Sequence, residues 1–344
     1  MNTNRRIHEL CSHLKTWGLA SLLIENPVDL YYLTGLTLSR GRLIVTPTGA
    51  TLFIDGRYID YAKEKAPVPA SLWKSDTKFS LQGSVGFDSS WTTVAQLESL
   101  QREMSDVELI PRERPLQAQR LIKEESELEL LRKAAEITWQ GVEHIRTLFK
   151  EGVSEQELAT EYEYFVRKKG ASKLSFDSII AFGEQSAYPH HRSSSKRLEH
   201  DQIILVDVGV VYQGYCGDLT RVFFFGKPHP QLKKMYDLVK QAADAASSCV
   251  CPGAHLGTLD RAARDLFAKA GVEELFNHNL GHGVGLDVHE YPSLRWDGVD
   301  KDVLLAKNMV FTIEPGLYQA GLGGVRYENT GVVTNHGFES FYPE

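Results

Sequence analysis

The first third of the chain alternates between two hydrophobic periods. Residues 4–17 repeat apolar side chains at helical spacing, whereas short apolar runs bounded by turn residues are typical of buried strands. Together these patterns predict helices over 4–17 and 58–65, and strands over 20–24, 43–46, 50–54 and 84–88. The turn at Pro47-Thr48-Gly49 joins two of these strands into a predicted hairpin. This mixture of elements indicates an α/β domain.

A polar stretch with two prolines separates this region from a longer one. From Lys123 a charged segment repeats apolar residues at helical spacing, and Ser154 with Glu157 forms a capping-box pattern that starts a further helix. The remaining chain predicts helices over 230–248 and 256–270, and strands over 203–211, 215–225, 309–314 and 325–334. Because 344 residues exceed one ordinary domain, we expect a first domain over 1–119 and a second over 120–344.

Composition excludes several classes of protein. The net charge of −7 disfavours nucleic acid and anionic membranes as partners, since both require a concentrated basic surface. No apolar stretch approaches the roughly 20 residues of a membrane span, and the first residues lack the pattern of a secretory signal. Four cysteines in a chain of this length do not make a disulfide framework, so we expect free thiols and a cytoplasmic location.

Two aspartates interrupt apolar strands in the second domain. Asp207 lies in the run 203–211 and Asp218 in the run 215–225, and a turn centred on Tyr212-Gln213 would set them directly opposite each other. Buried like charges repel and are poorly solvated, so one of them is protonated or cations lie between them. The alternative, in which each aspartate caps a turn, is disfavoured because both positions lie inside apolar strands.

A second pair of acids repeats this arrangement near the C-terminus. Glu314 ends an apolar strand and Glu328 lies on another, and a hairpin centred on Gly321 would set the two opposite each other. One buried carboxylate pair could be structural, but two such pairs favour a metal site.

Two histidines follow one another in a glycine-rich segment between these hairpins. His282 is flanked by glycines that permit close backbone approach to a ligand, and His289 lies seven residues later. The glycines lack the βαβ context of a dinucleotide loop, and Ser293 stands where a zincin helix requires a second histidine. Four carboxylates and the His282 imidazole can hold two divalent ions that activate a water as nucleophile. Oxygen-rich ligation favours Mn²⁺ or Co²⁺ over a cysteine-type zinc site, although Zn²⁺ remains an alternative.

Six short motifs together are similar to those of the pita-bread metallopeptidases, the family of methionine aminopeptidase, aminopeptidase P and prolidase. They are VDVG at 206–209, GDLTR at 217–221, GHGVG at 281–285, VHE at 288–290, TIEPG at 312–316 and VRYEN at 325–329. The resemblance implies an α+β pita-bread catalytic domain and a centre with two metal ions. It implies that Asp207 chelates one ion, that Asp218 and Glu328 bridge both, and that His282 and Glu314 bind the other.

The same resemblance implies roles for residues around the metals. Glu314 would also act as general acid and base, and His289 would lie beside the substrate carbonyl. His190, in the segment 181–191, would bind substrate. Arg326 and Tyr318 match positions that line the pocket for proline peptides.

The first domain resembles the creatinase/prolidase N-terminal domain, through the segments 26–35 and 55–58. Because methionine aminopeptidases lack that domain, the resemblance points to cleavage of the Xaa-Pro bond of short peptides by an Xaa-Pro dipeptidase or an aminopeptidase P. It also implies a homodimer. A dedicated enzyme has a physical rationale, since an Xaa-Pro bond has no N–H and a fixed φ.

Two departures and three alternatives accompany this interpretation. Asn329 stands where an aspartate is common, and Tyr327 replaces a smaller aliphatic residue. The alternatives are a metal-free binding module of the same fold, a creatinase-like amidinohydrolase, and an aminopeptidase of other specificity, such as methionine removal. The first two are expected to lack metal ligands, whereas all five positions are present here.

Overall fold

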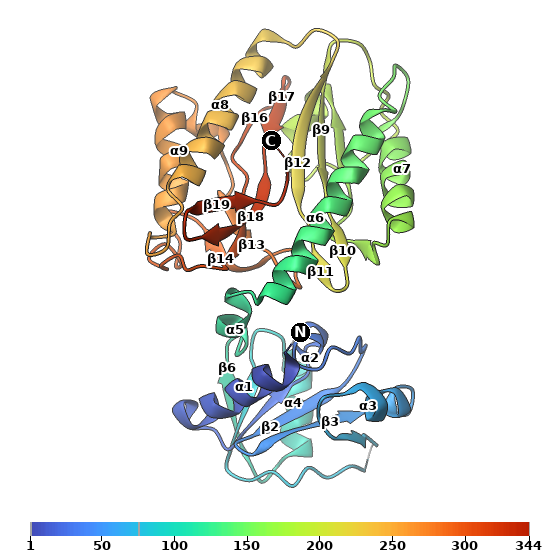
Figure 1. Cartoon of the computed structure of the whole chain (residues 1–344), viewed down its shortest axis with the longest axis vertical. Helices are drawn as coiled ribbons and strands as arrows, with labels where there is room; N and C mark the ends of the chain where they lie inside the picture. The colour runs from blue at the N-terminus through green and yellow to red at the C-terminus, as the bar shows by residue number, and fades with distance from the viewer. Residues whose placement is uncertain (1, 75, 344) are drawn as a thin grey trace. The chain divides into compact units, whose positions relative to one another are not determined.

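The computed structural model describes residues 2–74 and 76–343. The chain divides into two compact units, with the boundary between Arg120 and Leu121. The N-terminal unit contains a six-stranded sheet in the order β4-β3-β2-β1-β5-β6 (Figure 1). Its elements are α1 (Thr3–Trp17), β1 (Ser21–Ile24), α2 (Pro27–Thr34), β2 (Arg42–Thr46), β3 (Gly49–Ile54), α3 (Ile59–Lys65), β4 (Ala70–Leu72), β5 (Ser84–Asp88), α4 (Val94–Glu103) and β6 (Glu108–Arg112).

The sheet of this unit is mixed. β1 pairs antiparallel with β2 and parallel with β5. Because parallel neighbours need a crossover connection, the chain crosses over between β1 and β5. The predicted hairpin is confirmed, because Thr46 pairs with Gly49 across the turn. Helix α4 is absent from the prediction, although Thr93 and Gln96 form a capping box at its start.

The C-terminal unit follows the short helix α5 (Gln117–Leu121), which crosses the boundary. Its helices are α6 (Glu125–Arg146), α7 (Glu155–Lys168), η1 (Gly183–Ala187), α8 (Pro230–Ser248), α9 (Gly257–Lys269) and η2 (Glu273–Leu275). Its strands are β7 (Lys173–Leu174), β8 (Ile179–Phe182), β9 (Gln202–Val208), β10 (Val210–Tyr212), β11 (Tyr215–Cys216), β12 (Leu219–Phe225), β13 (Gly281–Gly283), β14 (Glu290–Leu294), β15 (Val310–Ile313), β16 (Gly316–Gln319), β17 (Gly323–Arg326), β18 (Asn329–Thr334) and β19 (Gly337–Ser340).

Two pairs of helices cover the strands of this unit. α6 contacts α7, and together they pack on β8, β9 and β10; α8 contacts α9, and α8 packs on β15, β16 and β17 (Figure 1). The strands form sheets in the orders β11-β10-β7, β12-β9-β8, β14-β13-β15-β18-β19 and β16-β17. The predicted capping box of α7 is confirmed, since Ser154 and Glu157 exchange both of its hydrogen bonds. The predicted mixture of helices and strands is also confirmed.

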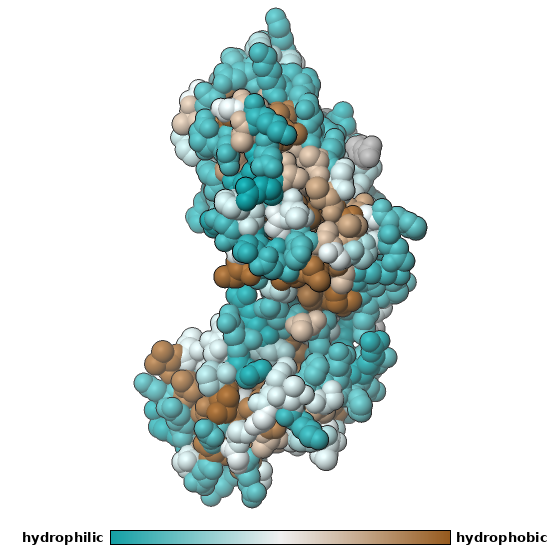
Figure 2. All heavy atoms as spheres, turned by 90° about the vertical axis from the view of Figure 1, so that its left-hand side faces the viewer, coloured by the Kyte–Doolittle hydropathy of each residue, from teal (hydrophilic) through white to brown (hydrophobic). Residues whose placement is uncertain are grey.

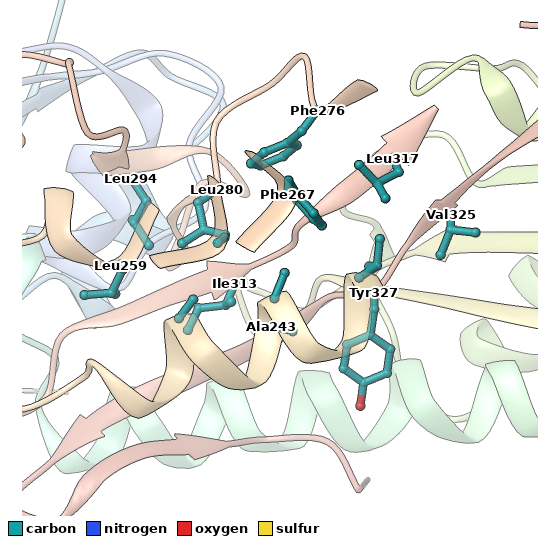
Figure 3. Packing of buried hydrophobic residues seen from close by; sticks show 14 of the residues in the cluster. Ala243, Leu259, Phe267, Phe276, Leu280, Leu294, Ile313, Leu317, Val325 and Tyr327 are labelled. Atoms are coloured by element: carbon teal, nitrogen blue, oxygen red, sulfur yellow. The ribbon is translucent and has the colours of Figure 1, made fainter. Parts of the chain in front are cut away.

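The largest apolar core lies between the second helix pair and the strands that it covers (Figure 3). Phe267 of α9 and Leu317 of β16 are fully buried there. Burying a side chain of this size stabilises the fold by about 1.5–3 kcal/mol, so this core fixes the strands on which the acids lie. Its labelled members are Ala243, Leu259, Phe267, Phe276, Leu280, Leu294, Ile313, Leu317, Val325 and Tyr327.

The surface is mainly hydrophilic on the face drawn in Figure 2, with smaller apolar areas between the polar ones. Among the residues that the structure describes, none of the helices combines the length and the apolar content that a membrane crossing requires. All four cysteines are free thiols, as expected.

Candidate active site

The hairpin between β10 and β11 turns one residue later than the sequence suggests. Gln213 and Gly214 both have positive φ, 44° and 86°, and Tyr212 pairs with Tyr215 across them. A two-residue turn with positive φ at both positions is type I′, which favours glycine. The glycine therefore occupies the second turn position, and the centre of the hairpin lies one residue after the predicted centre at Tyr212-Gln213.

This shift changes the partner of the first aspartate. Asp207 pairs with Thr220, so the prediction that Asp207 and Asp218 lie directly opposite each other is wrong. The displacement is two residues along the chain, which preserves the face because side chains alternate with a period of two. The backbones also approach closely here, since a Cβ on Gly209 would lie 2.1 Å from the carbonyl oxygen of Gly217. The two carboxylates therefore remain neighbours.

The second hairpin has the predicted register. Ile313 pairs with Asn329, and Gly316 pairs with Arg326, which sets position 314 opposite position 328. The backbone amide of Glu314 donates to Leu280, and the hydroxyl of Thr220 donates to Glu328 Oε2 at 2.6 Å. Glu314 is thus held by the residue that precedes β13, and Glu328 is held by a residue of β12.

His282 on β13 faces three of the acids. Its Nε2 lies 3.3 Å from Glu314 Oε1 and 3.6 Å from Asp218 Oδ2. One potential ligand atom from each of Asp218, His282 and Glu328 falls within 4.8 Å of the others, a spacing at which the three can share one cation. The backbone amide of His282 donates to Thr312 Oγ1, which in turn donates to Glu314 Oε1.

A buried arginine joins the remaining aspartate to this group. Arg326 pairs through Nη2 with Asp207 Oδ2, through Nε with Thr220 Oγ1 at 3.0 Å, and through Nη1 with the Tyr318 hydroxyl at 2.7 Å. Burial raises the pKa of Tyr318 to about 12, so this phenol stays neutral. His278 Nε2 lies 3.0 Å from the same hydroxyl and extends the chain of hydrogen bonds.

Burial and mutual repulsion oppose ionisation of three acids. Burial raises the pKa of Asp218 well above its usual value, and the charges of Glu328 and Asp207 raise it further. Burial also raises the pKa of Glu328, together with the charges of Glu314 and Asp207. The pKa of Asp207 is raised by burial despite the opposing charge of Arg326.

Glu314 and His282 instead form a charged pair. Burial alone would raise the pKa of Glu314, but its hydrogen bond with His282 and the imidazolium charge lower the pKa to about 2. Burial would lower the pKa of His282, but the hydrogen bond and the charge of Glu314 outweigh it and raise the pKa.

The chemistry of these residues fits divalent cations. Carboxylate oxygens and imidazole nitrogen are the ligands that Mn²⁺, Co²⁺ and Zn²⁺ accept. Asp207 Oδ1 is buried without a hydrogen-bond partner among the described residues. Buried acids with raised pKa values require positive charge to ionise together, and one arginine and one histidine are too few for four carboxylates. Divalent cations would supply the missing charge.

A further histidine lies beside the cluster. The ring centroids of His289 and His282 are 4.3 Å apart, so His289 borders the candidate ligands. Burial lowers the pKa of His289 and the charge of His282 lowers it further, whereas the charge of Glu314 opposes this shift. The structure therefore brings the five candidate ligands together with His289, Arg326 and Tyr318, whereas the substrate role of His190 stays a prediction.

The two departures from the family pattern meet at one buried arginine. Arg221 Nη2 donates to Asn329 Oδ1 at 2.8 Å, and Nη1 donates to the backbone oxygen of Glu328 at 2.6 Å. The Tyr327 ring lies between the Arg221 guanidinium, at 4.5 Å, and Lys240 Nζ, at 4.6 Å. Both unusual residues thus contact Arg221, the residue that donates to the backbone oxygen of Glu328.

Two further residues escaped the sequence interpretation. His278 lies four positions before His282, and its histidine side chain was the only available signal. Tyr342 accepts a hydrogen bond at 3.0 Å from the backbone amide of Asp218, although 124 positions separate the two. Nothing in the sequence around Tyr342 indicates this contact.

Comparison with known proteins agrees with this geometry. Metallopeptidase family M24 matches residues 129–335, and the Creatinase/Prolidase N-terminal domain matches residues 6–122. The chain belongs to metallopeptidase family M24. The pita-bread catalytic domain and the creatinase-like N-terminal α/β domain expected from the motifs are therefore confirmed, as is the expected metallopeptidase class.

Three similar proteins match nearly the whole chain. An Xaa-Pro dipeptidase from Pyrococcus horikoshii is 34% identical over 340 residues, covering 97% of this chain and 95% of the relative. The structure of an Xaa-Pro dipeptidase from Bacillus anthracis is 32% identical with a TM-score of 0.94, covering 100% and 99% of the two chains. The structure of an X-Pro aminopeptidase from Thermotoga maritima is 29% identical with a TM-score of 0.87, covering 95% and 96%.

Proposed function

We propose that this M24 peptidase hydrolyses the bond before proline in Xaa-Pro dipeptides. The observation that carries the proposal is the convergence of three buried carboxylates and the partly buried Glu314 with His282 in one cluster. The similarity to Xaa-Pro dipeptidases along almost the entire chain supports the choice of substrate.

The five proposed metal ligands are Asp207, Asp218, His282, Glu314 and Glu328. Divalent ions held by these residues would supply a water of lowered pKa and would polarise the substrate carbonyl. The ligand residues fix where that chemistry would occur, since neighbouring residues hold them in place by hydrogen bonds.

The remaining residues bind substrate and move protons. Glu314 lies at the edge of the cluster and is the proposed general acid and base, which takes a proton from the nucleophile and gives it to the departing proline nitrogen. His289 and His190 are proposed to hold the substrate carbonyl in position. Arg326 and Tyr318 are proposed to shape the pocket, and the neutral Tyr318 hydroxyl links Arg326 to His278.

An aminopeptidase acting on longer Xaa-Pro peptides is the second candidate. The similarity to the X-Pro aminopeptidase from Thermotoga maritima supports it. Turnover of Ala-Pro, Ala-Pro-Ala and Met-Ala-Ser by the protein purified with Mn²⁺ separates the two candidates. We expect Ala-Pro to be the best substrate. Preferred cleavage of Ala-Pro-Ala would favour the aminopeptidase, and turnover of Met-Ala-Ser alone would refute Xaa-Pro specificity.

A ligand variant tests the centre itself. Glu328→Gln keeps the size of the side chain but removes its charge, so we expect loss of bound metal and of dipeptide hydrolysis. Lys133→Gln, on the exposed face of α6, is the control and should retain both. Full activity of Glu328→Gln, or a metal-free protein that remains active, would contradict the assignment.

We further propose Mn²⁺ as the native ion, a homodimer as the assembly and the cytoplasm as the location. Oxygen-rich ligation supports the first, and four free thiols support the last. We also propose that the functional domains divide at residues 1–119 and 120–344.

A further inference from the structure

One fully buried carboxylate lies outside the candidate metal cluster. Glu155 is the first residue of α7, and its side chain is 0% exposed. Its Oε1 accepts a hydrogen bond from the Phe182 amide at 2.8 Å. Its Oε2 accepts three more, from His191 Nε2 at 2.8 Å, from the Ser194 amide at 2.8 Å and from the Ser194 hydroxyl at 2.7 Å. Four donors therefore converge on a single side chain.

All four donors belong to one segment, residues 182–194, which also carries His190. Phe182 ends β8 where the segment begins, His191 follows His190 directly, and Ser194 lies where the segment turns toward β9. Backbone bonds reinforce this attachment, because the Glu155 amide donates to the oxygen of Lys196. One carboxylate thus fixes the start, the middle and the end of the segment.

The other side of the segment rests on the hairpin of the candidate site. The Gly324 amide donates to Ser186 Oγ at 2.8 Å, and a Cβ on Gly324 would lie 2.3 Å from the Ser186 carbonyl oxygen. Gly324 lies on β17, two residues before Arg326. The segment is therefore held between the start of α7 and the strand that carries Arg326.

We propose that Glu155 is a positioning residue, which acts through His191 and Ser194 to hold His190 in place for binding substrate. This inference rests on the proposed function, because it assumes that His190 contacts substrate. Glu155 itself contacts no proposed ligand or substrate group among its hydrogen-bond partners.

Only a carboxylate satisfies this arrangement. Each of the four partners presents an N–H or O–H, and an ionised carboxylate accepts on both oxygens. The N-terminal turn of α7 also favours negative charge at this position. In a glutamine, one of the two carboxylate oxygens is replaced by an NH₂ group, which cannot accept a hydrogen bond. The donors that face this NH₂ group would then be buried without an acceptor.

The test compares Glu155→Gln with Glu157→Gln. Glu157 lies in the same first turn of α7 but is exposed, and its side chain accepts a hydrogen bond from the Ser154 amide in the capping box. For Ala-Pro hydrolysis we expect Glu155→Gln to lower kcat/KM about tenfold or more, with bound metal unchanged, and Glu157→Gln to remain within about twofold of the parent.

A double-mutant cycle distinguishes positioning from general loss of structure. His190→Ala should lower kcat/KM about 100-fold, and Glu155→Gln should add less than about twofold in that background, because its effect passes through His190. An equal loss from Glu155→Gln with and without His190, or no loss in the parent, would overturn the proposal. An unaffected His190→Ala variant would instead refute the substrate role assigned to His190.

Two milder variants keep the test open if Glu155→Gln fails to fold. His191→Ala and Ser194→Ala each remove one donor to Glu155 Oε2 and leave the carboxylate in place. Each should lower kcat/KM about threefold to tenfold and lose this effect beside His190→Ala. Wild-type kcat/KM in both variants would overturn the proposal.

Discussion

Tyr342→Phe is the sharpest test of how the candidate metal centre is supported. The Tyr342 hydroxyl accepts a hydrogen bond from the backbone amide of Asp218, and both residues are 4% exposed. Phenylalanine keeps the ring and its packing but removes this acceptor. The amide would then be buried without a partner, which costs about 1–3 kcal/mol.

The structure sets the size of the expected effect. In a domain of 150–250 residues, each kcal/mol lowers Tm by about 2–4 °C, so Tyr342→Phe should lower the Tm of the metal-free protein by roughly 2–12 °C. Because the bond orients the backbone of a proposed ligand, the dissociation constant for Mn²⁺ should rise about tenfold. Differential scanning calorimetry of the metal-free protein and Mn²⁺ titration calorimetry measure the two quantities.

Tyr236→Phe is the matched control. Tyr236 lies on α8 with its ring edge-on to Phe224, and it is half-buried. Removal of the Tyr236 hydroxyl should change the free energy of unfolding by less than about 0.5 kcal/mol. If Tyr342→Phe matched this control in both Tm and Mn²⁺ affinity, the hydroxyl would have no supporting role at Asp218.

Two more predictions concern metal removal and a buried ion pair. Chelation should abolish dipeptide hydrolysis, and Mn²⁺ at about 100 times its dissociation constant should then raise Tm by about 5–11 °C, the equivalent of about 2.7 kcal/mol; an unchanged Tm would contradict the metal assignment. Lys123 Nζ lies 2.6 Å from Glu290 Oε1, with side chains 1% and 9% exposed, so Lys123→Met should cost about 3–5 kcal/mol in urea unfolding. Lys133→Met breaks the exposed pair with Glu136 and should cost less than about 1 kcal/mol, and equal losses would refute the distinction.

The sequence predicted those parts of the fold in which a single local pattern, such as an apolar run or a turn glycine, determines the structure. The run from residue 203 onward is almost entirely apolar, so an acid inside it had to be buried, and the structure buries Asp207. The second hairpin was predictable because Gly321, with a φ of 76°, marks a turn between two strands of defined polarity. The position of this turn residue therefore determines the register of the second hairpin.

The remaining features depend on contacts between distant segments. In the first hairpin, the sequence pattern is compatible with a turn at any of the three adjacent residues Tyr212, Gln213 and Gly214. Only the positive backbone φ angles show that Gln213 and Gly214 form the turn. Glu155 looks like an ordinary first-turn acid of a helix, because nothing local shows that His191 and Ser194 fold back onto it. Long-range hydrogen bonds of this kind leave no periodic signal in a single sequence.

The hairpin that carries Glu314 and Glu328 also restricts where the chain can change in length. Its register is constant from the pair Val310–Val332 to the pair Gln319–Gly323. Adding or deleting one residue within β16 or β17 would turn the acids on one strand to the opposite face. Extra residues between Gln319 and Gly323 would only lengthen the loop, so evolutionary insertions and engineered peptide tags should be tolerated there and excluded from the adjoining strands.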